Sequence, residues 1–267
     1  MKFLKSSLLS AAAVIVANQA SAADLEVTHW WTSGGEAAAV AEFAKAFNAT
    51  EHSWIDGAIA GSGGTARPII ISRIIGGDPM HATQLNHGRQ AEELVEAGLM
   101  LDLSDIAAEG GWADVVNPSR LLDSCTLDGK VYCVPVNIHS PQWLWLSHDA
   151  FAKAGLDVPS DWFEFVAAAP ALRDAGVVPL AMGQQAWQTD LAFGAIQVAV
   201  GGTDLYLDVL TNKNADAAAS ADMTKVFEAY ADARLLSVGS NVNDWNQATN
   251  LVITGQAGGQ IHGDWAQ

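Results

Sequence analysis

Alternating and amphipathic stretches follow one another along the chain. Residues 25–31 alternate between apolar and polar side chains, which is typical of a strand. Apolar residues then recur at i, i+3, i+4 and i+7 from Val40, which predicts a helix over 36–47. The same succession continues along the sequence, so we predict an α/β fold with mainly parallel sheets. Further strands are expected at 54–60, 82–86, 143–146, 177–181 and 258–262, and further helices at 65–75, 89–97, 148–154, 161–169, 190–200, 221–236 and 244–254.

Two of these helices have predicted N-caps. Thr65 follows a glycine-rich turn at 61–64, and Ser160 precedes the helix at 161–169; both residue types commonly cap helices. The turn at 61–64 resembles an anion-binding turn, but it lacks the lysine that ends a P-loop, so we interpret it as a helix start. The stretch 103–124 has no clear period, and we expect loops there.

The N-terminus predicts a secretory signal peptide. Lys2 and Lys5 precede an apolar run at 8–17, and Ala20-Ser21-Ala22 has the small residues of a cleavage site. The apolar run is too short to cross a membrane. We therefore expect residues 1–22 to be removed and the remainder to be exported in soluble form.

Length and composition favour one large or two modest globular domains. The chain has 267 residues, of which 50% are hydrophobic and 16% are charged, so bulk disorder is disfavoured. The apolar and turn-forming segments indicate a change of lobe near 135–140. We expect a first α/β lobe at 23–135 and a second at 136–267.

The charge balance excludes two classes of partner. Lys+Arg 13 against Asp+Glu 30 gives a formal net charge of −17. Nucleic-acid binding requires a basic surface that displaces counterions from phosphates, and docking on anionic lipid has the same requirement. We therefore expect neither nucleic acid nor an anionic membrane surface as a partner.

The two cysteines flank a predicted hairpin. Cys125 and Cys133 enclose Asp128-Gly129, which is a strong hairpin signal between β-prone residues. A hairpin places the two sulfur atoms opposite each other, and an oxidising compartment favours a disulfide. A pair of redox-active thiols is the alternative, although the spacing is not Cys-x-x-Cys.

Tryptophan is unusually frequent, with ten Trp against three Tyr. Trp30 and Trp31 end the first predicted strand, and ligands of open α/β sheets bind beyond the carboxyl ends of strands. Adjacent strand residues point to opposite faces. Either both rings are packed in the core, or one is in the core while the other lines a cleft.

Four tryptophans at predicted element ends suggest a carbohydrate site. Flat indole rings fit the C–H faces of a sugar, and carboxylates and amides fit its hydroxyl groups. Each polar candidate is also explained as a helix cap or a surface residue. The tryptophans are Trp30, Trp31, Trp187 and Trp245, and the polar candidates are Glu36, Gln84, Asn86, Asn137, Gln185 and Asp244.

Metal and nucleophile motifs are missing from the sequence. The seven histidines form no His-x-x-x-His pair, and there is no Gly-x-Ser-x-Gly motif. A glycosidase needs two carboxylates across a cleft, and the sequence gives no reason to pair any two. We predict no metal site, no cofactor and no catalytic residue.

The segment 28–36, THWWTSGGE, resembles the mature start of bacterial periplasmic sugar-binding proteins. These are the family 1 extracellular solute-binding proteins of ABC importers, and the similarity is greatest to the glucose/mannose-binding branch. Further agreements, in the family's order, are Gly76-Gly77-Asp78-Pro79, Gln84, 134–139, Trp245 and Gly263-Asp264-Trp265.

The resemblance implies a fold and an activity. The fold is the two-lobed periplasmic binding protein fold of type II, and the activity is binding of a monosaccharide by hinge closure without chemistry. Glucose is the first expectation, then mannose or galactose. The implied partners are the permease subunits of an ABC transporter, and the protein is expected to be a periplasmic monomer.

The resemblance also implies site residues. Trp30, Trp31 and Glu36 would contact the sugar from the first lobe, with Asn86 or its neighbour His87. Trp245 would face the sugar from the second lobe, and Trp187 would line the cleft. Asn137 and His139 are expected to be structural or hinge-like.

Two alternatives remain open at this point. A secreted carbohydrate-active enzyme would also have an aromatic cleft. Family members continue beyond the Gly-Asp-Trp motif at 263–265, so we expect the C-terminal part of the fold to be missing and the second lobe to be incomplete. A non-functional fragment of a binding protein is therefore the other alternative.

Overall fold

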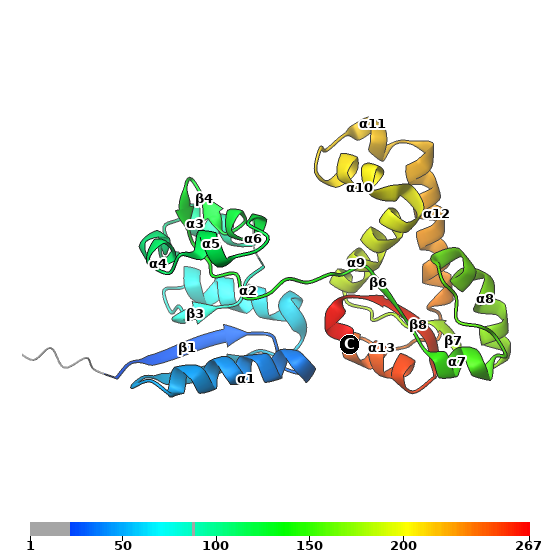
Figure 1. Ribbon diagram of the computed structural model, residues 1–267, viewed down its shortest axis with the longest axis horizontal. Coiled ribbons are helices and arrows are strands. Elements are labelled where there is room, and N and C mark those ends of the chain that lie inside the picture. The colour runs from blue at the N-terminus through cyan, green and yellow to red at the C-terminus, as the bar shows by residue number, and fades with distance from the viewer. Residues whose placement is uncertain (1–21, 87–88) are drawn as a thin grey trace, which may run out of the picture.

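The computed structural model describes residues 22–86 and 89–267, and these form two α/β lobes (Figure 1). We call the part that contains strands β1–β5 the first lobe and the part that contains β6–β8 the second lobe. A single extended segment, 132–142, connects them. Most of the predicted signal peptide, and the candidate His87, lie outside the described residues.

The first lobe is built on a three-stranded parallel sheet. Strand β1 (Asp24–His29) lies between β2 (Ser53–Ala58) and β3 (Ala82–Thr83), as the predicted succession of strands and helices requires. Buried side chains of the second helix pack with residues from the following segments to form the core of this lobe. The core residues are Ala66, Ile70, Ile74, Met80 and Leu94, and the helices are α1 (Gly34–Asn48), α2 (Ser62–Ile75) and α3 (Arg89–Glu96).

The stretch expected to be loops contains three short helices. They have four to six residues each, so apolar spacing cannot reveal them in sequence. A hairpin then ends the lobe, with Asp128 at φ 50° and Gly129 at φ 76° in its turn. The elements are α4 (Ser104–Glu109), α5 (Trp112–Val115), α6 (Arg120–Asp123), β4 (Thr126–Leu127) and β5 (Lys130–Val131).

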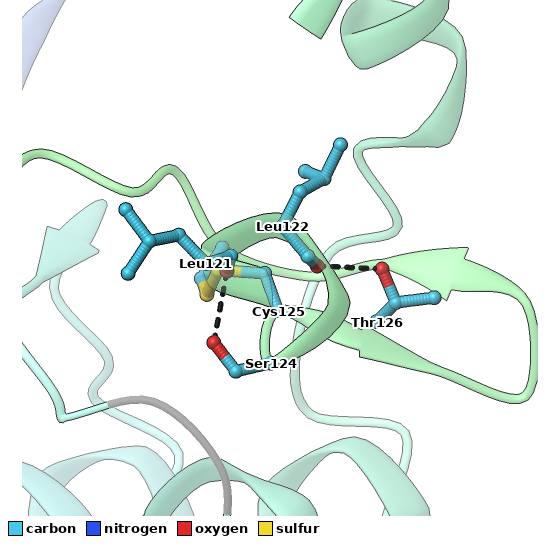
Figure 2. The surroundings of a disulfide bond; sticks show 6 residues. Leu121, Leu122, Ser124, Cys125 and Thr126 are labelled. Carbon is cyan, nitrogen blue, oxygen red and sulfur yellow. Dashed lines mark hydrogen bonds between the residues drawn. A yellow bond between two sulfur atoms is a disulfide. The ribbon is translucent and has the colours of Figure 1, made fainter. Parts of the chain in front are cut away.

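The predicted disulfide between Cys125 and Cys133 is formed across this hairpin, with the Cα atoms 5.1 Å apart. Figure 2 shows how the end of α6 is held beside it. The Ser124 hydroxyl donates to the Leu121 carbonyl, and the Thr126 hydroxyl donates to the Leu122 carbonyl, each at 2.8 Å. The disulfide therefore closes a small, locally hydrogen-bonded unit at the end of the first lobe.

The second lobe has a three-stranded mixed sheet centred on its last strand. Strand β8 (Ala257–His262) pairs in parallel with β7 (Val178–Leu180) and antiparallel with β6 (Trp143–Leu146). All six residues of β8 are buried. A Cβ at Gly259 would lie 2.8 Å from the Trp145 carbonyl oxygen, so only glycine fits there.

Helices surround this sheet and supply most of its core. Phe151, Phe165, Leu172, Leu180 and Ile196 are almost completely buried in one large cluster. The helices are α7 (His148–Lys153), α8 (Trp162–Asp174), α9 (Ala186–Ile196), the π-helical turn η1 (Gln197–Gly201), α10 (Gly202–Leu210), α11 (Ala215–Ala218), α12 (Ala221–Leu236), α13 (Trp245–Ile253) and the 3₁₀ turn η2 (Asp264–Ala266).

Both predicted N-caps are wrong. Helix α2 begins three residues before Thr65, because Gly61 takes the left-handed conformation, φ 100°, that starts it. In α8 the cap is Asp161, whose carboxylate accepts from the Glu164 backbone N–H at 2.8 Å, while Ser160 donates to the Glu164 carboxylate. Helix α9 likewise starts four residues before its predicted first residue, and α10 and α11 were not predicted.

Within residues 22–86 and 89–267, no helix has the length and apolar character needed to span a bilayer. The carboxyl ends of β1 and β8 each lead directly into a tryptophan-containing segment. Figure 1 shows the end of β8, in red, on the side of the second lobe that is turned toward the first lobe.

Candidate functional site

The chain leaves the first sheet immediately after β1, at Trp30 and Trp31. Their backbone N–H groups are bound by side chains: the Trp30 N–H donates to the Gln84 Oε1 at 3.0 Å, and the Trp31 N–H donates to the His29 Nδ1 at 3.2 Å. Because Nδ1 is an acceptor, the proton is on His29 Nε2, which donates to the Asp56 Oδ1 at 2.6 Å. Side chains following β3 and within β2 therefore fix the position of this tryptophan pair.

The two indole rings lie in different surroundings. Trp30 packs against the core of the first lobe, and a Cβ at Gly63 would lie 3.3 Å from its ring. Trp31 is 9% exposed and its ring lies edge-on to the His139 ring, with the centroids 6.4 Å apart. Since His139 belongs to the segment between the lobes, Trp31 is the tryptophan of this pair that is directed out of the first lobe.

Glu36 lies in the first turn of α1, close in sequence to this pair. Its side chain is partly buried, and it has no hydrogen bond or ion pair among the described residues. Burial raises the pKa of Glu36 to about 7. The helix N-terminus favours the charged form, but the loss of hydration outweighs it.

In the second lobe, Trp187 and Trp245 lie at the starts of two helices that are tied together. Trp245 is the first residue of α13 and Trp187 is the second residue of α9. The Gln185 amide donates to the Asp244 carboxylate at 2.8 Å, and the Trp187 Nε1 donates to the Gln185 Oε1 at 2.8 Å. Asp244 also caps α13 in a capping box with Gln247. The polar candidates Gln185 and Asp244 therefore position these two indoles.

His262, the last residue of β8, lies among three indole rings. The ring centroids of Trp187, Trp245 and Trp265 are 5.3, 5.5 and 5.0 Å from the centroid of His262. We call these three tryptophans and His262 the indole cluster. The indoles are partly buried and the imidazole is 1% exposed. Burial lowers the pKa of His262 to about 4, so the imidazole is neutral near neutral pH.

His139 connects the first lobe to the indole cluster. Its ring lies 4.7 Å from the Trp265 ring in an edge-on arrangement, in addition to its contact with Trp31. The Asn137 amide lies 2.6 Å from His139 Nε2 and donates to it. His139 Nδ1 consequently carries the proton and donates to the Asp264 carboxylate at 3.1 Å. A continuous set of ring contacts therefore runs from Trp31 to the second lobe.

The structure brings three of the predicted site residues into one set of contacts: Trp31, Trp187 and Trp245 are linked through His139, Trp265 and His262. Trp30, Glu36 and Asn86 are not part of that set. Asn86 is exposed, and its N–H donates to the Gln90 side chain at 3.2 Å.

Sequence reasoning missed His262 and Trp265 as site residues. Both lie at the carboxyl end of β8, where the same strand-end argument that selected Trp30 and Trp31 applies. Among the described residues, no group of three or more His, Cys, Asp or Glu is arranged to hold a metal ion.

The sequence and the fold were compared with those of known proteins. The model of the bacterial extracellular solute-binding proteins matches residues 31–267. The chain belongs to this family. Its two-lobed α/β fold is shared with solved binding proteins: it superposes on the bacterial solute receptor AcbH with a TM-score of 0.72 at 21% identity, covering 91% of this chain and 61% of that one. A chitin oligosaccharide binding protein gives a TM-score of 0.74 at 21% identity, covering 92% and 62%.

Curated members of the family are similar along the whole chain. A probable sugar-binding periplasmic protein of Brucella melitensis is 35% identical over an alignment of 255 positions, which covers 94% of this chain and 60% of that protein. One from Rhizobium meliloti is 34% identical over an alignment of 269 positions, which covers 100% of this chain and 64% of that protein. The chain thus spans less than two thirds of the length of these solute-binding proteins.

Proposed function

We propose that this protein is the periplasmic substrate-binding component of an ABC importer for a monosaccharide. The observation that carries the proposal is the set of tryptophans at strand and helix ends of both lobes, joined through His139. The family membership supports it, and so do the Brucella and Rhizobium relatives, which are probable sugar-binding periplasmic proteins.

Binding would use the two kinds of group that the site offers. Indole faces would bury the C–H surface of a sugar ring, and carboxylate and amide groups would bind its hydroxyls. A pocket that pairs with a particular hydroxyl discriminates against epimers, because the wrong epimer leaves its own buried groups unpaired. We assign the sugar contacts to Trp31, Glu36, Trp187 and Trp245, with Trp30, Asn86 and His87 as further candidates.

Closure would follow from the arrangement of the lobes. We propose lobe boundaries at 23–135 and 136–267, with bending at the connecting segment around His139. A ligand favours the closed form only through contacts that it makes there and not in the open form. The closed lobes would then be recognised by the permease subunits, and no covalent chemistry, metal or nucleic acid would be involved.

The ligand we propose is D-glucose, with D-mannose and D-galactose as the next candidates. The structure of AcbH is described as revealing an exclusive preference for b-D-galactopyranose, so a single sugar ring is an established ligand size for this fold. Residues 1–22 would be removed on export to the periplasm. We expect the mature protein to be a monomer there.

Thermal unfolding with added sugar tests the proposal. The purified protein would be melted alone and with millimolar D-glucose, D-mannose, D-galactose and maltose. A ligand of the native state raises the melting temperature by mass action, so one monosaccharide is expected to raise it and maltose is not. A cooperative transition that none of the sugars shifts would contradict the proposed function. The absence of a cooperative transition would favour a fragment that does not fold alone.

A further inference from the structure

His262 is a buried polar side chain with an unpaired nitrogen. Its Nε2 atom is shielded from solvent and has no hydrogen-bond partner among the described residues. Buried polar atoms are almost always paired, because an unpaired one costs stability. An apolar side chain of similar size would pack among the three indoles without that cost. The nitrogen therefore requires an explanation other than packing.

The chemical state of this imidazole suits a hydroxyl group. Because its pKa is lowered to about 4, His262 is neutral near neutral pH. A neutral imidazole has one N–H donor and one nitrogen acceptor, and a hydroxyl group can serve as the partner of either. The buried location strengthens a hydrogen bond formed there, since the local dielectric constant is low.

The location of His262 is that of a ligand contact. It is the last residue of the central strand β8, and ligands of α/β sheets bind beyond the carboxyl ends of the strands. The partly buried rings of Trp187, Trp245 and Trp265 lie between 5.0 and 5.5 Å from it, centroid to centroid. A sugar stacked on one of these indoles would have its hydroxyl groups close to the imidazole.

We propose that His262 is a specificity-determining ligand contact: one indole of the cluster turns aside on binding, and Nε2 then forms a hydrogen bond with one hydroxyl group of the sugar. Side-chain rotations of this kind are common on binding even where the backbone does not move. The proposal rests on the proposed function, because it names the group that the site presents to the sugar.

Three substitutions of His262 distinguish the effect of the Nε2 atom from the effect of the flat ring. His262→Phe keeps a flat ring and removes both nitrogens. His262→Gln places an amide close to the position of Nε2, whereas His262→Asn places it close to the position of Nδ1. His148→Phe is the matched control, because His148 is exposed at the start of α7 and is not part of the indole cluster.

The first measurement is thermal unfolding without sugar. Removal of an unpaired buried nitrogen is expected to leave the melting temperature of His262→Phe equal to or above that of the wild type. Phe is larger than His, so the comparison that decides is with His262→Gln, which keeps a polar group near Nε2. A melting temperature clearly lower for His262→Phe than for His262→Gln would mean that Nε2 is paired in the native protein and would overturn the inference without any reference to sugar binding.

The second measurement is calorimetric titration with D-glucose, D-mannose and D-galactose. For the sugar that the wild type binds, His262→Phe is expected to weaken binding about five- to tenfold, while His262→Gln stays within about twofold of the wild type and His262→Asn resembles His262→Phe. The His148→Phe control is expected to match the wild type. Equal affinity of wild type and His262→Phe would overturn the inference while leaving the proposed function intact.

Monodeoxy analogues of the sugar identify the partner hydroxyl. One analogue is expected to bind wild type and His262→Phe with equal affinity, because the missing hydroxyl and the missing nitrogen remove the same hydrogen bond. If every analogue shows the full difference between the two proteins, the nitrogen has no single hydroxyl partner and the proposal fails. If the wild type binds none of the three parent sugars, the proposed function fails and this inference fails with it.

Discussion

The tryptophan pair of the first lobe and the indole cluster of the second lobe are held in place by different means. Trp30 and Trp31 are fixed through their backbone N–H groups, which donate to Gln84 and His29. In the second lobe the rings themselves are held: they pack around the buried His262, and the Trp187 indole N–H also donates to Gln185. The first lobe thus has polar contacts at the backbone of its tryptophans, whereas the second lobe has contacts at the rings.

The difference predicts how each region responds to substitution. In the first lobe, loss of one hydrogen-bonding side chain should displace a whole tryptophan with little loss of packing. In the second lobe, loss of one ring should leave the helix starts in place, because Gln185, Asp244 and Gln247 hold them independently. The four predictions below are ordered from the largest expected effect to the smallest.

The largest effect is expected from Trp245→Ala. Truncation of a central tryptophan in a binding site typically removes about 2 kcal/mol, so sugar affinity should fall about thirtyfold. The melting temperature without sugar should barely change, because the capping box of α13 is retained. Titration calorimetry and thermal unfolding would measure the two quantities. Trp143→Ala is the control, since Trp143 is 49% exposed and stacks on Trp145 outside the indole cluster; equal losses of affinity in both variants would contradict the assignment.

The next effect is expected from His29→Leu, which removes the acceptor of the Trp31 N–H. Sugar affinity should fall about fivefold, which corresponds to about 1 kcal/mol for one lost hydrogen bond. His29→Asn should retain most of the affinity, because the Asn carbonyl oxygen lies near the position of Nδ1. Affinities that are equal in the two variants would show that the contact of His29 with Trp31 does not position the site.

The third prediction concerns the pH dependence of stability, because burial raises the pKa of Glu36 in the first lobe and lowers that of His262 in the second lobe. Burial raises the pKa of Glu36 to about 7 from 4.5, so the folded protein retains this proton where the unfolded chain has lost it. The resulting stability is fully present below about pH 4.5 and is lost as the pH rises through about 7. After allowance for solvent screening we expect a loss of about 1 kcal/mol.

The measurement is the melting temperature of wild type and Glu36→Gln between about pH 5 and about pH 8. The wild type should lose stability relative to the variant as the pH rises, since the variant has no carboxyl group to ionise. Parallel curves would show that Glu36 is not desolvated. Burial lowers the pKa of His262 from 6.5 to about 4, so this group makes both proteins more stable as the pH rises toward about 6.5. Because the effect is the same in wild type and variant, it cancels in the comparison.

The smallest effect is expected from Asp264→Asn at the connection between the lobes. The hydrogen bond from His139 Nδ1 to the Asp264 carboxylate, 3.1 Å long, joins two side chains that are 36% and 40% exposed, and a hydrogen bond this exposed contributes about 0.5 kcal/mol. Sugar affinity should therefore change by about twofold. A change as large as that of Trp245→Ala would mean that the pair sets the angle between the lobes.

Long periodic segments of the fold were predictable, and short ones were not. The alternation of strands and helices, the parallel pairing of β1 and the hairpin around Asp128-Gly129 follow from local pattern and turn chemistry. Helices α4, α5 and α6 have too few residues to show a period. The start of α2 depends on the left-handed backbone of Gly61, which competes with the side-chain capping expected of Thr65.

Candidate site residues could be predicted from the sequence where they directly follow a strand with a clear alternating pattern. Trp30 and Trp31 follow an obvious strand, so the strand-end argument found them. His262 and Trp265 lie at an equivalent position, but His262 is flanked by glycine and isoleucine, a context that suggests only a buried strand. Its relation to Trp187 and Trp245 depends on contacts between segments far apart in the sequence, which no local pattern reveals.

The position of β8 in the second lobe has a consequence for the timing of folding. In the described part of the chain, β6 and β7 are paired only with β8, which follows both of them in the sequence. Neither can enter this sheet until the ribosome has synthesised residues 257–262, so β6 has no strand partner while the long segment between β6 and β8 is made. The sheet of this lobe is therefore completed by pairings between residues far apart in the sequence, which form slowly compared with local contacts.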